Sequence, residues 1–109
     1  MTTLYGIKTC DTCRKAAKAL QVAGQTVTFR DIRADPLDDV TLAQFLDAFG
    51  MALVNTRSTT WRALTEAERA EPPMVLLRSH PTLMKRPVIE GRGGLTLGWK
   101  KDAQAAQLG

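Results

Sequence analysis

The chain has 109 residues, of which 44% are hydrophobic and 24% are charged, as expected of one globular domain. It has no run of the ~20 apolar residues that a membrane span requires and no signal-peptide pattern at its start, so we expect neither a membrane protein nor an exported one. Fifteen lysines and arginines against eleven acids give a formal charge of +4, a modest excess that suits a pocket for a small anion. The absence of basic runs interleaved with aromatics argues against direct binding of nucleic acid.

The first third of the chain predicts a strand, a helix and a second strand. Residues 2–6 form an apolar-edged stretch, and residues 26–32 alternate with a period of two and are rich in β-branched side chains. Residues 11–23 carry an apolar stripe at helical spacing, formed by Cys13, Ala16, Ala17 and Leu20. A strand–helix–strand unit of this length predicts two parallel strands joined by a right-handed crossover.

The middle of the chain predicts helices only. A turn at residues 35–38 leads into a helix whose apolar face ends at Gly50, and residues 55–58 form a loop. Residues 60–69 are expected to be helical. A further helix opens at Pro72-Pro73, runs through Leu77 and ends at His80-Pro81.

The last third predicts a β-hairpin and a helix. Residues 86–90 and 95–99 form the two strands, residues 91–94 the turn, and residues 102–108 the terminal helix. The whole chain, 1–109, is therefore expected to be a single α/β domain with a small mixed four-stranded sheet. The order of its elements is that of a thioredoxin-like fold with an all-helical insertion at about residues 36–84.

Two cysteines stand where the first predicted strand turns into the first helix. Cys10 and Cys13 are three positions apart, which is too close for a structural disulfide that cross-links distant parts of the fold. The spacing suits a reversible redox pair in a reducing compartment. At a helix start, unpaired backbone N–H groups and the helix dipole favour a thiolate. Lys8 and Arg14, close to Cys10 in the sequence, are further candidate sources of positive charge for its thiolate.

Other roles for the pair remain open at this point. Free cysteines are often small buried hydrophobes, and CxxC is also half of a zinc site. A zinc site needs further ligands, and the chain offers only His80, far along the sequence, so we expect no metal. Cys13 is expected either to resolve a Cys10 intermediate into an internal disulfide or to pack into the core below the helix.

Three blocks of sequence together resemble the arsenate reductase (ArsC)/Spx family, and most closely its YffB-like branch. The likeness covers essentially the whole chain and the order of its elements. The blocks are Leu4-Tyr5-Gly6-Ile7-Lys8-Thr9-Cys10, Asn55-Thr56-Arg57-Ser58 and Lys85-Arg86-Pro87-Val88-Ile89.

The resemblance implies a thioredoxin-like fold and a role for each matched residue. Cys10 matches the nucleophilic cysteine, and Arg86 matches the arginine that helps to bind an oxyanion. Pro87 is then the candidate cis-proline, facing the Cys10 turn. Arg57 and Lys8 are the further candidate anion-binding residues, although a surface salt bridge explains Arg57 equally well.

The chain departs from glutaredoxin-linked arsenate reductases, which surround their cysteine with three arginines. The second of these falls at Asn55 and the third near Trp99, both neutral. Cys13 is also absent from those reductases and instead resembles the CxxC switch of Spx, which acts on RNA polymerase. These departures put arsenate in doubt as the substrate.

The resemblance implies a cytoplasmic thiol-dependent reductase, with Cys10, Cys13 and Arg86 as its catalytic residues. Its substrate would be a small oxyanion or a thiol/disulfide compound, with glutathione or glutaredoxin as the thiol donor and no bound cofactor. The alternative is an Spx-like redox-switched regulator that binds the RNA polymerase α subunit.

Overall fold

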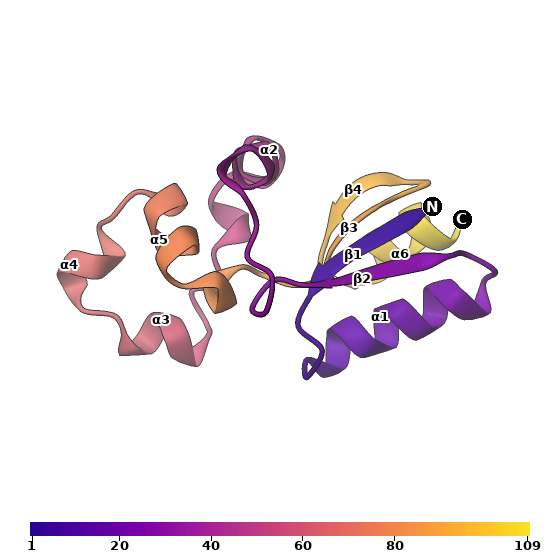
Figure 1. Cartoon of the computed structure of the whole chain (residues 1–109), viewed down its shortest axis with the longest axis horizontal. Helices are drawn as coiled ribbons and strands as arrows, with labels where there is room; N and C mark the ends of the chain where they lie inside the picture. Colours follow the sequence, from indigo (N-terminus) through magenta and orange to yellow (C-terminus); the bar gives the residue numbers. More distant parts are fainter. The chain divides into compact units, whose positions relative to one another are not determined.

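The computed structural model describes residues 1–109, which divide into two compact units (Figure 1). One unit combines the two ends of the chain, Met1–Ile32 and Arg86–Gly109, and holds all the strands. The other is Arg33–Lys85 and is built from helices. No helix in the chain is both long and apolar enough to cross a bilayer.

The first unit is organised by a four-stranded mixed sheet, as predicted. Its strands are β1 (Thr2–Gly6), β2 (Val27–Asp31), β3 (Val88–Gly91) and β4 (Gly94–Leu97). They lie in the order β2-β1-β3-β4, and β1 pairs in parallel with β2. The β1–β3 and β3–β4 pairs are antiparallel. The central strand β1 is thus flanked by two strands that are distant from each other in the sequence.

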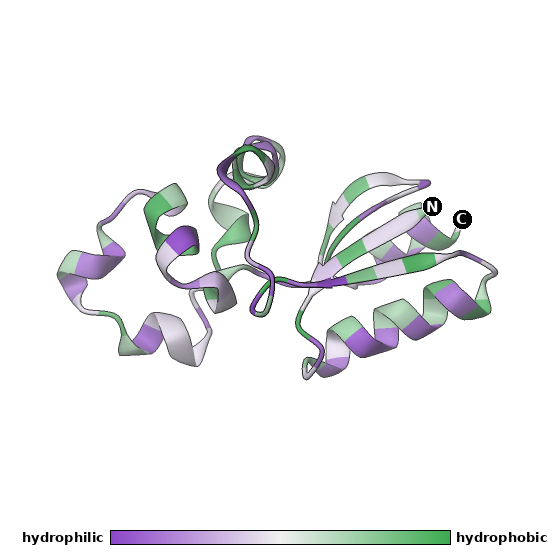
Figure 2. Cartoon of the chain, in the orientation of Figure 1, coloured by the Kyte–Doolittle hydropathy of each residue, from purple (hydrophilic) through white to green (hydrophobic).

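Helix α1 (Asp11–Val22) covers the sheet with its apolar stripe, and α6 (Lys101–Leu108) closes the unit. Leu4 of β1 and Ile89 of β3, cross-strand partners, form one buried cluster with three residues of α1. Those three are Cys13, Ala16 and Leu20. Leu108 of α6 packs against the same cluster. Hydrophilic and hydrophobic residues alternate along α1, as expected of a helix with one buried face (Figure 2).

The second unit has its own core. Its helices are α2 (Asp39–Phe49), α3 (Thr59–Ala63), α4 (Glu66–Arg69) and α5 (Pro73–Ser79), with 3₁₀ turns at Gly50–Leu53 and Pro81–Leu83. An isolated antiparallel bridge pairs Val54, just after the first 3₁₀ turn, with Met84 near the end of the unit. The buried side chains include Leu42, Phe45, Leu53, Leu76, Leu77, Leu83 and Met84.

Two predicted elements differ most clearly from the structure. Residues 60–69, expected to be helical, are interrupted by one break: α3 ends before Leu64, whose backbone is extended, and α4 begins after Thr65. The Thr65 side chain accepts from the Glu68 N–H while the Glu68 carboxylate accepts from the Thr65 N–H, a capping box that starts a new helix. The strand expected from Arg86 begins at Val88.

Candidate active site

Cys10 is the N-cap residue of α1. Its backbone is extended, its N–H donates to the Ile7 carbonyl oxygen at 2.9 Å, and its carbonyl oxygen accepts from the Arg14 N–H at 3.0 Å. The side chain is partly exposed and touches the edge of the core cluster. The turn therefore presents an approachable sulfur at the positive end of a twelve-residue helix.

The surroundings of Cys10 favour its thiolate. Burial raises the pKa of the thiol, but the Cys13 N–H, the Cys13 thiol and the Arg86 guanidinium together outweigh it and hold the pKa below the ordinary value. Of the cations that the sequence indicated, Arg86 is the one that contributes to this pKa.

Cys13 is fully buried beneath Cys10. Burial raises the pKa of Cys13 to about 12, and the thiolate of Cys10 adds to the effect because the Cys13 thiol donates to it. The same side chain packs between Leu4, Leu20 and Ile89 in the core cluster. The two roles left open for Cys13 are thus compatible, since a core position also puts its proton and sulfur in contact with Cys10.

Gly6 makes room for the Cys13 sulfur, a function that the sequence analysis missed. A Cβ at Gly6 would lie 2.5 Å from Cys13 Sγ and 3.1 Å from its Cβ. No real Cβ is found that close, so only glycine fits at this strand end without displacing the cysteine. The sequence signal was present, because a glycine closes the strand shortly before the two cysteines.

Arg86 and Pro87 enter the site from the other segment of the first unit. The Arg86–Pro87 peptide bond is cis, as the resemblance implied, and Pro87 is buried. The Gly98 N–H donates to the Pro87 carbonyl oxygen at 2.8 Å, which ties the end of β4 to this loop. The Arg86 side chain donates to the Cys10 sulfur. One guanidinium is therefore held beside the thiolate.

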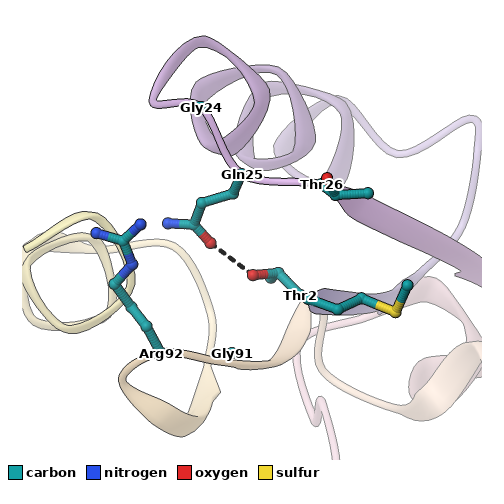
Figure 3. A pocket seen from close by; sticks show the side chains of 7 residues that line it. Thr2, Gly24, Gln25, Thr26, Gly91 and Arg92 are labelled. Atoms are coloured by element: carbon teal, nitrogen blue, oxygen red, sulfur yellow. Dashed lines mark hydrogen bonds between the residues drawn. The ribbon is translucent and has the colours of Figure 1, made fainter.

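A cavity of about 640 Å³ lies at the opposite end of β1 (Figure 3). Thr2 and Gln25 line it and are joined by a hydrogen bond from the Thr2 hydroxyl, and Arg92 stands at its hairpin side. Because Thr3 pairs with Glu90, Arg92 lies near the start of β1, whereas Cys10 follows its end. Arg92 is thus remote from the sulfur.

Residues 5–106 match the ArsC family. The chain belongs to the ArsC family. Among solved structures it is similar to a YffB protein, with a TM-score of 0.89 and 35% identity over the whole of both chains. It is also similar to an arsenate reductase (ArsC) related protein from Brucella melitensis, with a TM-score of 0.73 and 38% identity over 95% of this chain and 90% of that one.

Two curated relatives extend this picture of the family. An uncharacterised protein of Haemophilus influenzae is 42% identical over 97% of this chain and 98% of its own length. The global transcriptional regulator Spx of Bacillus subtilis is 30% identical over 94% of this chain and 82% of its own length. The chain is therefore similar both to an arsenate-reductase-related protein and to a transcriptional regulator.

The remaining ArsC-family positions lie in surroundings of different kinds. Asn55 is engaged in a turn, its side-chain oxygen accepting from the Arg57 N–H at 3.1 Å. Trp99 packs against the core cluster, and its carbonyl oxygen accepts from the Gln104 side chain at 2.8 Å. Arg57 and Lys8 are exposed, and the Lys8 N–H donates to Asp31 at 3.0 Å. Anion binding by Arg57 and Lys8 stays a prediction.

No cluster of three or more His, Cys, Asp or Glu side chains is close enough together to hold a metal ion.

Proposed function

We propose that this ArsC-family chain is a thiol-dependent reductase whose nucleophile is Cys10. The observation that supports the proposal is the local arrangement of three groups. A partly exposed sulfur caps a helix, a buried thiol donates to it, and a single guanidinium stands beside it. A lowered pKa and an approachable sulfur are what a reactive cysteine requires.

The reaction that fits these groups is two-step thiol–disulfide exchange. The Cys10 thiolate attacks one sulfur of a disulfide, a new S–S bond forms, and the other sulfur leaves as a thiolate. The Cys13 thiol then gives up its proton, and its sulfur attacks Cys10, which releases the second half of the substrate as a thiolate. The substrate gains two electrons, and the chain is left with a Cys10–Cys13 disulfide.

Turnover requires a donor that reduces this disulfide again. Glutathione or glutaredoxin is the proposed donor, and no bound cofactor takes part. Both species belong to compartments that keep thiols reduced, so the cytoplasm is the proposed location. If the substrate is an oxyanion instead, Arg86 is suited to hold it, because the planar guanidinium binds two oxygens at once.

The proposal is tested with a matched pair of variants that differ only in which sulfur is removed. We expect Cys10→Ser to lose reduction of hydroxyethyl disulfide in the presence of glutathione. We expect Cys13→Ser, treated with glutathione disulfide, to trap one glutathione on Cys10, whereas the wild type shows only the loss of two hydrogens by mass spectrometry. Full turnover by Cys10→Ser would exclude the mechanism.

A redox-switched regulator is the second candidate. It is favoured by the similarity to Spx over 94% of the chain, together with the CxxC pair that resembles the Spx switch. In that case the reduced and oxidised chains would differ in binding to the C-terminal domain of the RNA polymerase α subunit. A pull-down in both redox states separates the candidates, since binding in neither state removes the regulator.

A further inference from the structure

The positive charge of the chain is concentrated in one unit. Met1–Ile32 and Arg86–Gly109 together contain nine lysines and arginines against four acids, whereas Arg33–Lys85 contains six against seven. The whole excess therefore resides in the unit that carries Cys10. A concentrated field of one sign raises the encounter rate with partners of the other sign.

Much of this charge lies along α1 next to the cysteines. Arg14, Lys15 and Lys18 are exposed and take no part in an ion pair. They stand on the face opposite to the buried stripe of Cys13, Ala16 and Leu20. We call the outward side of α1 from Asp11 to Val22 the basic face.

The three cations of the basic face bring the helix little net stability. Arg14 and Lys15 stand four and three residues before Lys18, spacings at which like charges repel by a few tenths of a kcal/mol, and Asp11 attracts Arg14 and Lys15 by a similar amount at the same spacings. Arg14 and Lys15 also lie in the first turns, where the dipole favours acids. Activation of the thiol does not explain them, because the cation that lowers the pKa of Cys10 is Arg86. An external anionic partner would offset the repulsion.

The dimensions of the basic face indicate a polypeptide. At 1.5 Å per residue, the distance along the helix from Cys10 to Val22 is about 18 Å, more than one small thiol would cover. Val22 is 80% exposed, so the face ends in an apolar side chain that is open to solvent. Asp11 lies on the same face beside Cys10, and no aromatic residue accompanies the cations, an arrangement unlike a nucleic-acid surface.

We propose that the disulfide substrate of Cys10 is carried by an acidic polypeptide that docks along the basic face of α1. This inference rests on the proposed function, since it names the class of disulfide that Cys10 reduces. The chemistry is the exchange already described, with the acidic polypeptide supplying the disulfide and leaving as the thiol.

The test uses three synthetic peptides of equal length, each carrying one cysteine as a mixed disulfide with 2-thiopyridine. Glutamates, serines or lysines flank the cysteine. Cys10 attacks the peptide sulfur and releases 2-thiopyridone, whose absorbance gives the rate. At low ionic strength we expect the glutamate peptide to react about tenfold faster than the lysine peptide. The preference should largely vanish near ~1 M salt, where the screening length is about 3 Å.

Matched charge reversals locate the effect on the helix. Lys18→Glu and Arg92→Glu change the net charge equally, but Arg92 lies at the far end of β1. We expect Lys18→Glu to slow the glutamate peptide about threefold or more and to leave the serine peptide unchanged. Arg92→Glu should preserve the preference. Equal effects of the two variants, or equal rates of the charged peptides with the wild type, would overturn the docking surface.

The serine peptide separates this inference from the proposed function. If the serine peptide fails to react, Cys10 is not a reductase nucleophile, and docking is then measured by fluorescence anisotropy of a labelled glutamate peptide. Absence of Lys18-dependent binding would overturn docking as well. Displacement of that peptide by a lower concentration of a single-stranded oligonucleotide of equal charge would assign the basic face to nucleic acid and overturn the polypeptide.

Discussion

The two units of the chain reach stable structures by different means. In the strand-bearing unit, order comes from pairing between distant segments: β1 hydrogen-bonds to β2 on one side and to β3, more than eighty residues later, on the other. In the helical unit, order is more local. Asp38, Ser58 and Thr65 each accept from a backbone N–H three residues ahead and start α2, α3 and α4.

The difference between long-range and local order bears on which unit holds the reacting groups. Cys10, Cys13 and Arg86 all belong to the unit whose parts are far apart in sequence, and Arg86 meets Cys10 only because β3 pairs with β1. Long-range pairing holds a thiolate and a guanidinium in fixed geometry, which short capped helices alone do not provide. The helical unit contains Arg57, whose role in anion binding stays a prediction.

The largest expected effect concerns arsenate, which tests whether the helical unit supplies cations to the chemistry. Asn55 and Trp99 are neutral where the arsenate reductases of the family have arginines. Removing one preorganised donor costs roughly 10²–10³-fold in rate, so we expect arsenate reduction with glutathione and glutaredoxin to be at least about 10²-fold slower than reduction of a glutathione mixed disulfide. Comparable rates would show that Arg57 or Lys100 compensates. An Arg57→Gln variant would then identify which one.

The Arg86→Gln variant is expected to have the next largest effect, and it tests the long-range contact between Arg86 and Cys10 in the strand-bearing unit. Because Arg86 helps to hold the pKa of Cys10 below its ordinary value, its loss should raise that pKa and slow iodoacetamide alkylation at pH 7 by about tenfold, the effect of roughly one pKa unit. Because the variant only raises the pKa of Cys10, the variant and wild-type alkylation rates should converge at high pH, where Cys10 is a thiolate in both proteins. A rate deficit that persists unchanged at high pH would mean that Arg86 does not act on the charge. Arg92→Gln is the matched control.

The sequence predicted most of the fold because its signals are periodic or local. The strand at residues 2–6, the helix after Cys10 and the hairpin around Gly91–Gly94 follow from alternation, helical spacing and turn residues. The break between α3 and α4 was missed, although Thr65 and Glu68 have capping-box spacing, because residues 60–69 were expected to be helical throughout. Local side-chain hydrogen bonds start a new helix after Thr65.

The site was only partly accessible from the sequence for a different reason. Cys10 and Cys13 are neighbours in a motif, so their joint role could be proposed from spacing. Arg86 came from the family resemblance, since no local rule connects it with Cys10 across the sheet. Lys8 and Arg14, close in sequence, were expected to act on the thiol, yet Arg86 is the contributing cation. Gly6 was missed because a close approach of backbone to sulfur depends on tertiary packing.

Gly6→Ala tests the packing beneath the site and should have a moderate effect on stability. The added methyl would lie 2.5 Å from Cys13 Sγ, and overpacking of this kind costs about 1–3 kcal/mol in the free energy of unfolding. The contact is isolated by a double-mutant cycle in urea unfolding. In a Cys13→Ala background, where the sulfur is gone, Gly6→Ala should cost much less. An equal cost in both backgrounds would assign the penalty to the backbone rather than to the cysteine.

Thr65→Ala has the smallest expected effect and tests the claim that order in the helical unit is local. The variant removes the hydroxyl that accepts from the Glu68 N–H at 3.1 Å, and loss of such a cap costs about 1 kcal/mol. Thr59→Ala is the control, because Thr59 is exposed and stands inside α3 rather than at its cap. Amide hydrogen exchange should show the loss of protection confined to α4 and its neighbours in Arg33–Lys85. The strands β1 and β3 should keep theirs, because their hydrogen bonds depend on pairing across the sheet and not on this cap. Equal loss of protection in β1 would mean that the two units open together, and the contrast between local and long-range order would not hold.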